Sequence, residues 1–565
     1  MLFRSERLCG RQGGSSPAVL LAGMKLWKGT YMNKIRISQI KLPVTYTEQD
    51  LKQASAKALH ISAAQIKSLT IRKRSVDARK KPDIRYIFTV DVETAMDAHV
   101  LLKKQKSADI SLAEDIVYQY PVPGSEPLPD RPVIAGCGPA GLFCGLLLAR
   151  CGYRPLILER GEDVDTRTKT VENFWKTGAL KENSNVQFGE GGAGTFSDGK
   201  LNTLVKDHAG RNRFVLETFV KAGADADILY VNKPHIGTDV LRTVVKNIRQ
   251  EIESLGGEVR FGQQITDFSV KSGRLTGITV NGRETLDCSV CVLAIGHSAR
   301  DTFALLEKKQ IPMQAKAFAV GLRIEHPQEM IDFSQYGLRF GAGQLPAADY
   351  KLTGKLKNGR GVYSFCMCPG GYVVNASSEK ESLAVNGMSY RARDSRNANS
   401  AVVVTVTPDD YPEKGVLGGV QFQRNLERFA YRAGEGNVPV QLFADFQKRQ
   451  KSSSLGEVEP AIKGKWQLAD LRAGLPAFLA DSLEEGVLLF DHKIRGFARG
   501  DALFSGVESR TSSPVRILRG DNFTSPCAEG LYPCGEGAGY AGGITSAAVD
   551  GMKCAEAIVR KYCRL

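Results

Sequence analysis

The sequence predicts an α/β protein of more than one domain, and three observations carry this prediction. The chain has 565 residues, which is more than a single hydrophobic core usually supports. A segment with five prolines, from Pro121 to Pro132, separates an N-terminal region from the rest. Apolar strand-like segments that end in glycine-rich turns and continue as helix-like segments occur at 131–161 and again at 531–558.

The composition is typical of a soluble folded protein, with 42% hydrophobic and 24% charged residues. No apolar run is long enough to span a membrane, so we expect a cytoplasmic protein. The net charge of +15 would suit an anionic ligand or nucleic acid. The basic residues are spread along the chain, however, and the densest run, 71–85, is typical of a solvated loop between two strands. A nucleic-acid partner is therefore not expected.

The twelve cysteines match neither a disulfide framework nor a four-ligand zinc site. Cys288 and Cys291 form a CxxC, but they lie in an apolar run that indicates a buried strand. Zinc would need a second ligand pair, which the spacing does not offer. We therefore predict a reducing compartment and no metal.

Residues 1–33 form a basic extension with five arginines and lysines against one acid. This composition is similar to that of an organelle transit segment. An upstream start codon or a disordered extension explains it equally well, and we expect disorder.

Residues 34–120 predict a small α/β module with the pattern strand, helix, strand, strand, helix. The proline-rich residues 121–130 that follow are expected to form an extended linker.

Residues 133–145 carry the first chemical motif, a GxGxxG directly after an apolar strand and at the start of an apolar helix. Gly136 allows the tight turn, Gly138 lets the backbone approach a pyrophosphate, and Gly141 lets helix and strand pack closely. Pro139 stands where its missing N–H costs little. This pattern predicts that 131–310 begin a Rossmann-like dinucleotide-binding domain.

Glu159 ends the next strand and can accept hydrogen bonds from ribose hydroxyls. An acid at this position favours a free 2′-hydroxyl, so the bound nucleotide is expected to be FAD or NAD rather than NADP. Gly189, Gly191 and Gly194 repeat the GxGxxG spacing, but no apolar strand precedes them, so they do not predict a second dinucleotide fold.

The second strand–turn–helix, 531–558, resembles the closing segment of the two-dinucleotide-type FAD proteins. That resemblance implies FAD. It implies that Glu536 lies near the ribityl or pyrophosphate part of the cofactor and that the helix beginning at Gly542, Gly543 and Ile544 points at the flavin pyrimidine ring. A helix N-terminus there would stabilise the negative charge of a reduced flavin.

Four longer motifs, at 189–203, 294–300, 364–379 and 508–517, resemble an uncharacterised bacterial family of FAD-dependent dehydrogenases, the NAD(P)/FAD-dependent oxidoreductases. The resemblance extends from Lys34 to the C-terminus. It implies FAD and an oxidoreductase, and it implies no particular substrate.

Taken together, the motifs predict a Rossmann-like FAD/NAD(P)-binding domain made of 131–310 and 492–565, with an inserted mixed α+β substrate or cap domain at 311–491. The residues expected to bind the cofactor come from both halves of the domain and from the motif at 189–203. They are Gly136, Gly138, Pro139, Ala140, Gly141, Glu159, Arg160, Gly191, Gly192, Thr195, Gly535, Glu536, Gly542, Gly543 and Ile544.

Three residues are candidates for the chemistry itself. Cys366 and Cys368 lie two apart in a strand-like segment, so both sulfurs could face one ligand, although free cysteines are often only small buried hydrophobes. His297 follows a predicted strand and could act as an acid or a base, or only help to position the cofactor.

The leading functional prediction is an enzyme that transfers hydride between flavin N5 and either a small-molecule substrate or NAD(P)H. No second strand–GxGxxG–helix is present, so NAD(P)H would dock transiently. Two alternatives stay open: an RNA-modifying flavoenzyme, and a flavin-binding interaction protein that recognises partners through 34–120.

Overall fold

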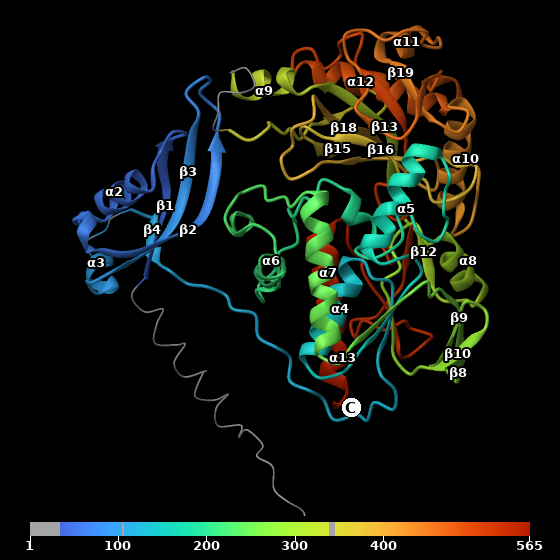
Figure 1. Cartoon of the computed structure of the whole chain (residues 1–565), viewed down its shortest axis with the longest axis horizontal. Helices are drawn as coiled ribbons and strands as arrows, with labels where there is room; N and C mark the ends of the chain where they lie inside the picture. Colours follow the sequence, from blue (N-terminus) through green and yellow to red (C-terminus); the bar gives the residue numbers. More distant parts are fainter. Residues whose placement is uncertain (1–33, 104, 106, 338–344, 565) are drawn as a thin grey trace, which may run out of the picture. The chain divides into compact units, whose positions relative to one another are not determined.

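The computed structural model describes residues 34–103, 105, 107–337 and 345–564 (Figure 1). The predicted basic extension at 1–33 lies outside these residues. The described chain divides into two compact units: one comprises 34–77 and 85–115, the other 78–84 and 116–564. No helix of the described residues is both long and apolar enough to cross a bilayer.

The smaller unit is a four-stranded antiparallel sheet in the order β2-β3-β1-β4, with two helices in a split β-α-β arrangement. The apolar side chains of β1 and β3 alternate with polar ones and form its core. Its elements are β1 (Lys34–Pro43), α2 (Glu48–Leu59), β2 (Ile66–Asp77), β3 (Arg85–Thr94), α3 (Ala98–Lys103) and β4 (Ile110–Leu112).

This unit differs from the sequence-based prediction in two respects. Strand β4 was not predicted. The basic run expected to be a loop lies partly in β2, which continues to Asp77, because β2 is an edge strand and all its residues in this run stay partly or fully exposed.

The larger unit contains a five-stranded parallel sheet in the order β24-β11-β5-β6-β7. The predicted α/β class with a parallel sheet is thereby confirmed. The chain order reverses between β5 and β11, as in doubly wound sheets, in which ligands bind outside the carboxyl ends of the strands at this switch point. The strands are β5 (Val133–Ala135), β6 (Leu156–Glu159), β7 (Glu258–Phe261), β11 (Cys291–Leu293) and β24 (Leu531–Pro533).

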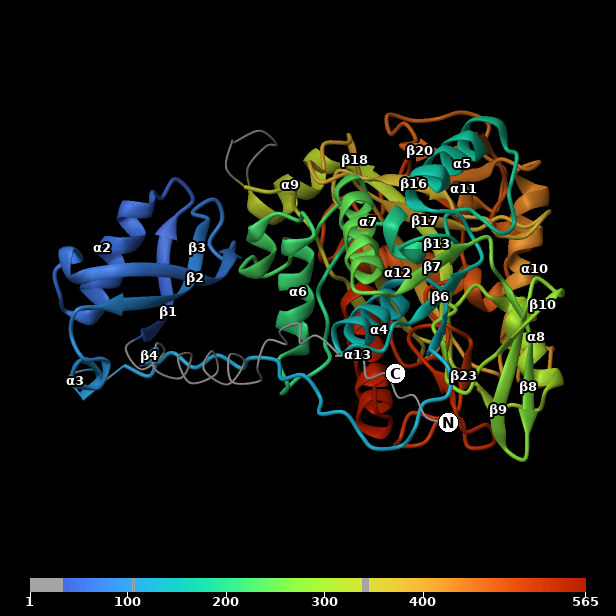
Figure 2. The same ribbon diagram turned by 60° about the horizontal axis from the view of Figure 1, so that its bottom comes forward.

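Both faces of the parallel sheet are covered, because successive side chains point to opposite sides. Ile134 and Ile157 pack against three helices that lie together in Figures 1 and 2: α4 (Pro139–Arg150), α7 (Thr238–Ser254) and α13 (Ile544–Lys561). Val133 and Leu158 pack on the other face against the antiparallel strands β8 (Ile265–Lys271), β9 (Arg274–Val280) and β10 (Glu284–Asp287).

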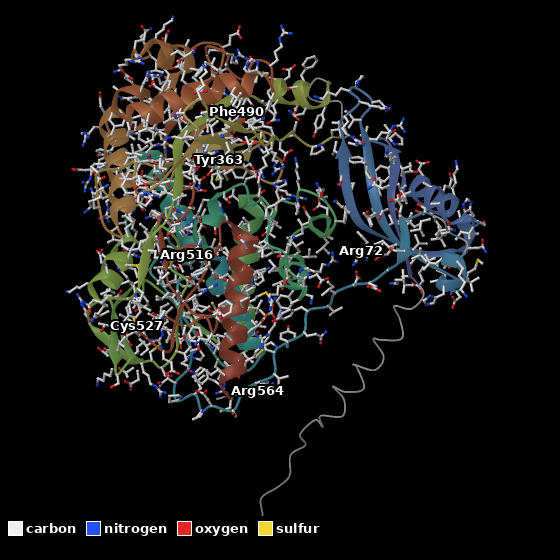
Figure 3. All side chains as sticks on the ribbon, turned by 180° about the vertical axis from the view of Figure 1, so that it is seen from behind. Arg72, Tyr363, Phe490, Arg516, Cys527 and Arg564 are labelled. Carbon is white, nitrogen blue, oxygen red and sulfur yellow. The ribbon has the colours of Figure 1, made fainter. Side chains whose placement is uncertain are left out.

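A second sheet has seven strands in the order β14-β15-β18-β13-β22-β19-β21, and only its β19–β21 pair is parallel. The buried Phe490 of α12 (Ala477–Asp491) belongs to the core on one face of this sheet, and Tyr363 lies on β15 (Figure 3). The strands are β13 (Phe318–Pro327), β14 (Thr353–Lys355), β15 (Gly361–Cys368), β18 (Asn397–Val406), β19 (Val438–Leu442), β21 (Trp466–Leu468) and β22 (Leu503–Glu508).

Strand β22 lies beyond Asp491, where the predicted inserted domain ends, and yet it pairs with β13 and β19. The second sheet therefore includes residues that the sequence grouped with the closing part of the first domain. The remaining strands form a ribbon of β12 (Met313–Ala315) and β23 (Val515–Ile517) and a small sheet of β16 (Tyr372–Asn375), β17 (Val385–Met388) and β20 (Ile462–Lys463).

The other helices of the larger unit flank the two sheets. They are α5 (Val164–Thr177), α6 (Arg211–Lys221), α8 (Arg300–Lys308), α9 (Gln328–Tyr336), α10 (Gly418–Ala433), α11 (Phe443–Lys448) and α12 (Ala477–Asp491).

Candidate active site

A cavity of about 1050 Å³ lies at the carboxyl ends of β5, β6 and β11 and extends to β15 of the second sheet. It therefore opens at the switch point of the parallel sheet. Thirteen of the sequence-predicted residues line it: Gly136, Gly138, Pro139, Ala140, Glu159, Arg160, Gly192, His297, Cys366, Glu536, Gly542, Gly543 and Ile544.

The first glycine loop leads from β5 into α4 along the cavity wall. Gly136 has a φ of 102°, which favours glycine, and Gly138 is the N-cap of α4. Gly141 does not line the cavity. A Cβ at Gly141 would lie 1.9 Å from the Gly136 carbonyl oxygen, so this glycine lets the helix pack against the turn, as its position in the motif predicts.

Glu159 holds three backbone segments together at the end of β6. Its buried carboxylate accepts hydrogen bonds from the amides of Cys137 at 2.8 Å, Gly161 at 2.9 Å and Gly189 at 3.0 Å. A carboxylate has about four acceptor sites, so one remains for a ligand in the cavity. The neighbouring Arg160 forms an ion pair with Asp301 at the cavity edge.

We expect Glu159→Ala to lower the free energy of unfolding by at least about 2 kcal/mol, because three buried amides lose their acceptor. Thermal unfolding of the FAD-free protein measures this effect without a contribution from cofactor binding. The matched control is Glu172→Ala, whose side chain is 59% exposed and which should change stability by less than about 1 kcal/mol. Equal melting temperatures for the two variants would show that the three hydrogen bonds do not support the fold.

The second glycine-rich run lies against the first loop and forms no strand–turn–helix unit; 192–196 are a short 3₁₀ helix. The Gly191 amide donates to the Cys137 carbonyl at 2.8 Å, and the Thr195 hydroxyl donates to the Glu190 carbonyl at 3.2 Å. Of the predicted residues in this run, only Gly192 lines the cavity, whereas Gly191 and Thr195 lie behind it.

The C-terminal glycine run brings a second helix start to the same cavity. Gly543, with a φ of 128°, is the N-cap of α13, and Ile544 lines the wall. A Cβ added at Gly542 or Gly543 would meet no described atom within 4 Å, so the space beside this helix start is open. Gly535 does not line the cavity; its amide donates to the Asp550 carboxylate at 2.7 Å.

His297 and Glu536 form a pair inside the cavity, with Nδ1 and Oε1 3.2 Å apart. The His297 side chain is only 10% exposed, and its Nε2 has no hydrogen-bond partner among the described residues. Since buried polar atoms are usually satisfied, Nε2 is available to a ligand.

Charged side chains from two further segments also line the cavity. Asp198 is buried and accepts hydrogen bonds from Lys200 at 2.5 Å and Arg393 at 2.6 Å. Although burial opposes it, the charges of Lys200 and Arg393 hold the pKa of Asp198 well below its usual range. Arg510 also lines the cavity, and its guanidinium is paired with the buried Glu427.

The two candidate thiols do not lie as strand alternation predicts. Cys366 lines the cavity, whereas Cys368 is buried behind it. The reason is a register shift in the pairing of β15 with β18 between Phe365 and Cys368, which adds one residue to β15. The prediction that both sulfurs face one ligand from the same strand face was therefore wrong.

Arg323 was missed by sequence reasoning, although it supports this part of the cavity. It is fully buried on β13, and its Nε donates to the Glu508 carboxylate at 3.0 Å. The sequence did contain an indication, because Arg323 stands in the otherwise apolar segment FAVGLRI. An arginine buried in such a strand requires a buried partner.

The cavity fits the predicted FAD. Two helix N-termini, those of α4 and α13, begin at its wall and offer free amides and positive dipole ends. Glu159 offers a remaining acceptor site, and Gly138, Gly542 and Gly543 leave room beside the backbone. The volume is at the upper end of that of ordinary ligand pockets, as a dinucleotide requires.

Comparison with known proteins identifies relatives of both units. Residues 317–511 match the family described as FAD-dependent protein, C-terminal domain-like, and 34–93 match a domain of unknown function. An uncharacterized protein of Clostridium beijerinckii is 51% identical over 533 residues, which are 94% of this chain and 99% of the relative. The FAD-dependent monooxygenase nodY1 of Hypoxylon pulicicidum is 23% identical over 175 residues, 30% of this chain and 38% of that protein. A solved structure of the flavin-dependent brominase Bmp2 aligns with a TM-score of 0.33 and 13% identity, over 76% of this chain and 79% of that chain.

Proposed function

Because this chain belongs to an uncharacterised bacterial family of FAD-dependent proteins, we propose that it is an oxidoreductase that binds FAD in the cavity and transfers hydride between a small molecule and flavin N5. One observation carries the proposal: the N-termini of α4 and α13 and the carboxylate of Glu159 line a single cavity at the switch point of the parallel sheet.

The adenosine end of FAD would lie at the first glycine loop. The first-turn amides of α4 would bind the pyrophosphate, because a helix N-terminus offers free N–H groups and a positive dipole end. Glu159 would use its remaining acceptor site for a ribose hydroxyl. Gly138 keeps this contact open, since any side chain there would enter the cavity.

The flavin end would lie at α13 and His297. When bound, FAD supplies two-electron redox chemistry. The positive end of α13 at Gly543 stabilises negative charge beside it, and the bare backbone at Gly542 lets a planar ring approach. The contact of Nδ1 with Glu536 orients the His297 ring, so Nε2 can hold or accept a proton at the ligand.

A nicotinamide would serve as a transient electron donor. In the described part of the chain only one parallel sheet of this type is present, and its switch point is already assigned to FAD. NADH or NADPH would therefore enter the same cavity from the side of β15 rather than bind a second dinucleotide domain.

The test mixes the FAD-loaded protein with NADH or NADPH without oxygen and follows the flavin absorbance. We expect one of the two nucleotides to bleach the band at a rate that saturates with its concentration. Gly138→Leu, which should lack FAD, is the control for reduction of free flavin. If the wild type carries FAD but neither nucleotide nor a pool of small metabolites bleaches it, the oxidoreductase proposal fails.

A further inference from the structure

Cys366 lines the cavity at an irregular point of β15. The extra residue between Phe365 and Cys368 forms a β-bulge, and Cys366 has a φ of 43°, in the left-handed region. A residue other than glycine in this region costs about 1–3 kcal/mol and persists only where its surroundings hold it. Bulges often re-aim side chains next to active sites.

Arg323 holds this conformation from behind. Its Nη1 and Nη2 donate to the Cys366 carbonyl at 3.1 and 3.2 Å, and its Nε donates to Glu508. The guanidinium is fully buried, so its hydrogen bonds fix the position of the Cys366 backbone. Cys366 is thus held at the cavity wall by a rigid support.

Cys368 lies directly behind Cys366. Its sulfur lies 3.2 Å from the Cys366 carbonyl oxygen and 4.0 Å from Nη1 of Arg323. Gly387 makes room for it, because a Cβ there would lie 2.7 Å from the Cys368 sulfur. The pair therefore consists of Cys366, which lines the cavity, and Cys368, which is buried behind it.

The charged groups around Cys366 come from three elements: Arg323 from β13, Lys200 from the segment after the 3₁₀ helix, and Glu508 from β22. Hydrogen bonding from Cys368, followed by the charges of Arg323 and Lys200, lowers the pKa of Cys366 to about 7. Burial raises the pKa of Cys368 well above its usual range. Since the thiolate is the nucleophile, Cys366 is the attacking member of the pair.

We propose that Cys366 and Cys368 form a redox-active dithiol–disulfide pair, with Cys366 as the thiol that exchanges with a small-molecule disulfide entering the cavity. This inference rests on the proposed function in one respect, because bound FAD would be the electron partner of the pair.

The exchange balances in two steps. The Cys366 thiolate attacks one sulfur of the small disulfide, which breaks the S–S bond and releases one thiolate that takes a proton from water. The Cys368 thiol attacks the Cys366 sulfur, which breaks the mixed disulfide, and its proton passes to the second thiolate, which leaves as a thiol. The Cys366–Cys368 disulfide then holds the oxidation, and two electrons and two protons from the reduced cofactor restore the dithiol.

The experiment equilibrates the wild-type protein, with FAD removed, in mixtures of 2-mercaptoethanol and its disulfide, hydroxyethyl disulfide. Free thiols are then alkylated and peptides are measured by mass spectrometry. We expect a reversible disulfide between Cys366 and Cys368, and in Cys368→Ser a mixed disulfide trapped at Cys366. Cys288 and Cys291 are the matched control, because this other close pair is fully buried away from the cavity and should stay reduced.

A second readout is the pH dependence of Cys366 alkylation by iodoacetamide. We expect a midpoint near pH 7 in the wild type and a higher midpoint in Cys368→Ala, which lacks the thiol donor. A disulfide that never forms at any ratio, or a midpoint near the ordinary thiol pKa of about 8.5, overturns the proposal. FAD content, measured on the same preparation before removal, keeps this result separate from a failure of FAD binding.

Discussion

Replacing Gly138 by leucine is expected to weaken FAD binding at least about 100-fold, or about 2.7 kcal/mol, while the fold is retained. Gly138 has a φ of −76° and a ψ of −176°, which leucine can adopt. A Cβ there would meet only the Gly192 Cα, at 3.8 Å, so the first atom fits. The rest of the side chain must then enter the cavity beside the α4 N-terminus, where the pyrophosphate would bind.

FAD retained through purification and a fluorescence titration of the FAD-free protein measure this loss. Gly361→Leu is the matched control: Gly361 is exposed on β15, its added Cβ would have its nearest neighbour at 4.0 Å, and it does not line the cavity. Wild-type FAD affinity in Gly138→Leu would contradict the proposed pyrophosphate site.

Glu427→Gln is expected to cost about 3–5 kcal/mol of stability, because the buried Arg510 loses its carboxylate partner and Arg300 keeps only Glu379. The Glu427 carboxylate is fully buried on α10 and accepts hydrogen bonds from Arg300 at 2.7 and 2.9 Å and from Arg510 at 2.8 and 2.9 Å. These contacts join α8, α10 and the segment after β22. The loss should also free Arg510, which lines the cavity.

Thermal unfolding of the FAD-free variants measures the loss of stability in Glu427→Gln, with Glu459→Gln as the control. The Glu459 side chain is 62% exposed and pairs with the similarly exposed Arg396, so its removal should cost less than about 1 kcal/mol.

The stabilisation by Glu427 also depends on pH. Although burial favours the protonated form, Arg300 and Arg510 hold the pKa of Glu427 well below its usual range. The advantage of the wild type is therefore complete above the pKa of a free glutamate, about 4.3, and shrinks as the pH falls below it. A loss as small as that of Glu459→Gln would contradict this role.

The parts of the cavity that the sequence predicted are those encoded locally. Gly136, Gly138 and Gly141 follow a strand and open a helix within a few residues, and Glu159 ends the next strand. The glycine-rich turn after β24 likewise predicted the start of α13 at Gly543. Each of these features needs only its own turn, strand end or helix N-terminus to be recognised.

The remaining features depend on tertiary packing. Strand alternation predicted that Cys366 and Cys368 both face the cavity, but pairing with β18 forms a bulge between Phe365 and Cys368, and only Cys366 lines the cavity. Arg323 and Glu427 find their partners on strands and helices far along the chain, and periodicity carries no information about such pairs. Strand β22 lies between β13 and β19 in the second sheet. The sequence of β22 alone does not indicate which strands it pairs with.

The most direct test of the central claim is the FAD content of the purified wild-type protein, measured from its visible spectrum and from the flavin released on denaturation. We expect the flavin absorbance bands and one FAD per chain, or full occupancy after incubation with FAD. A colourless protein that is folded and cannot be reconstituted with FAD would contradict the account.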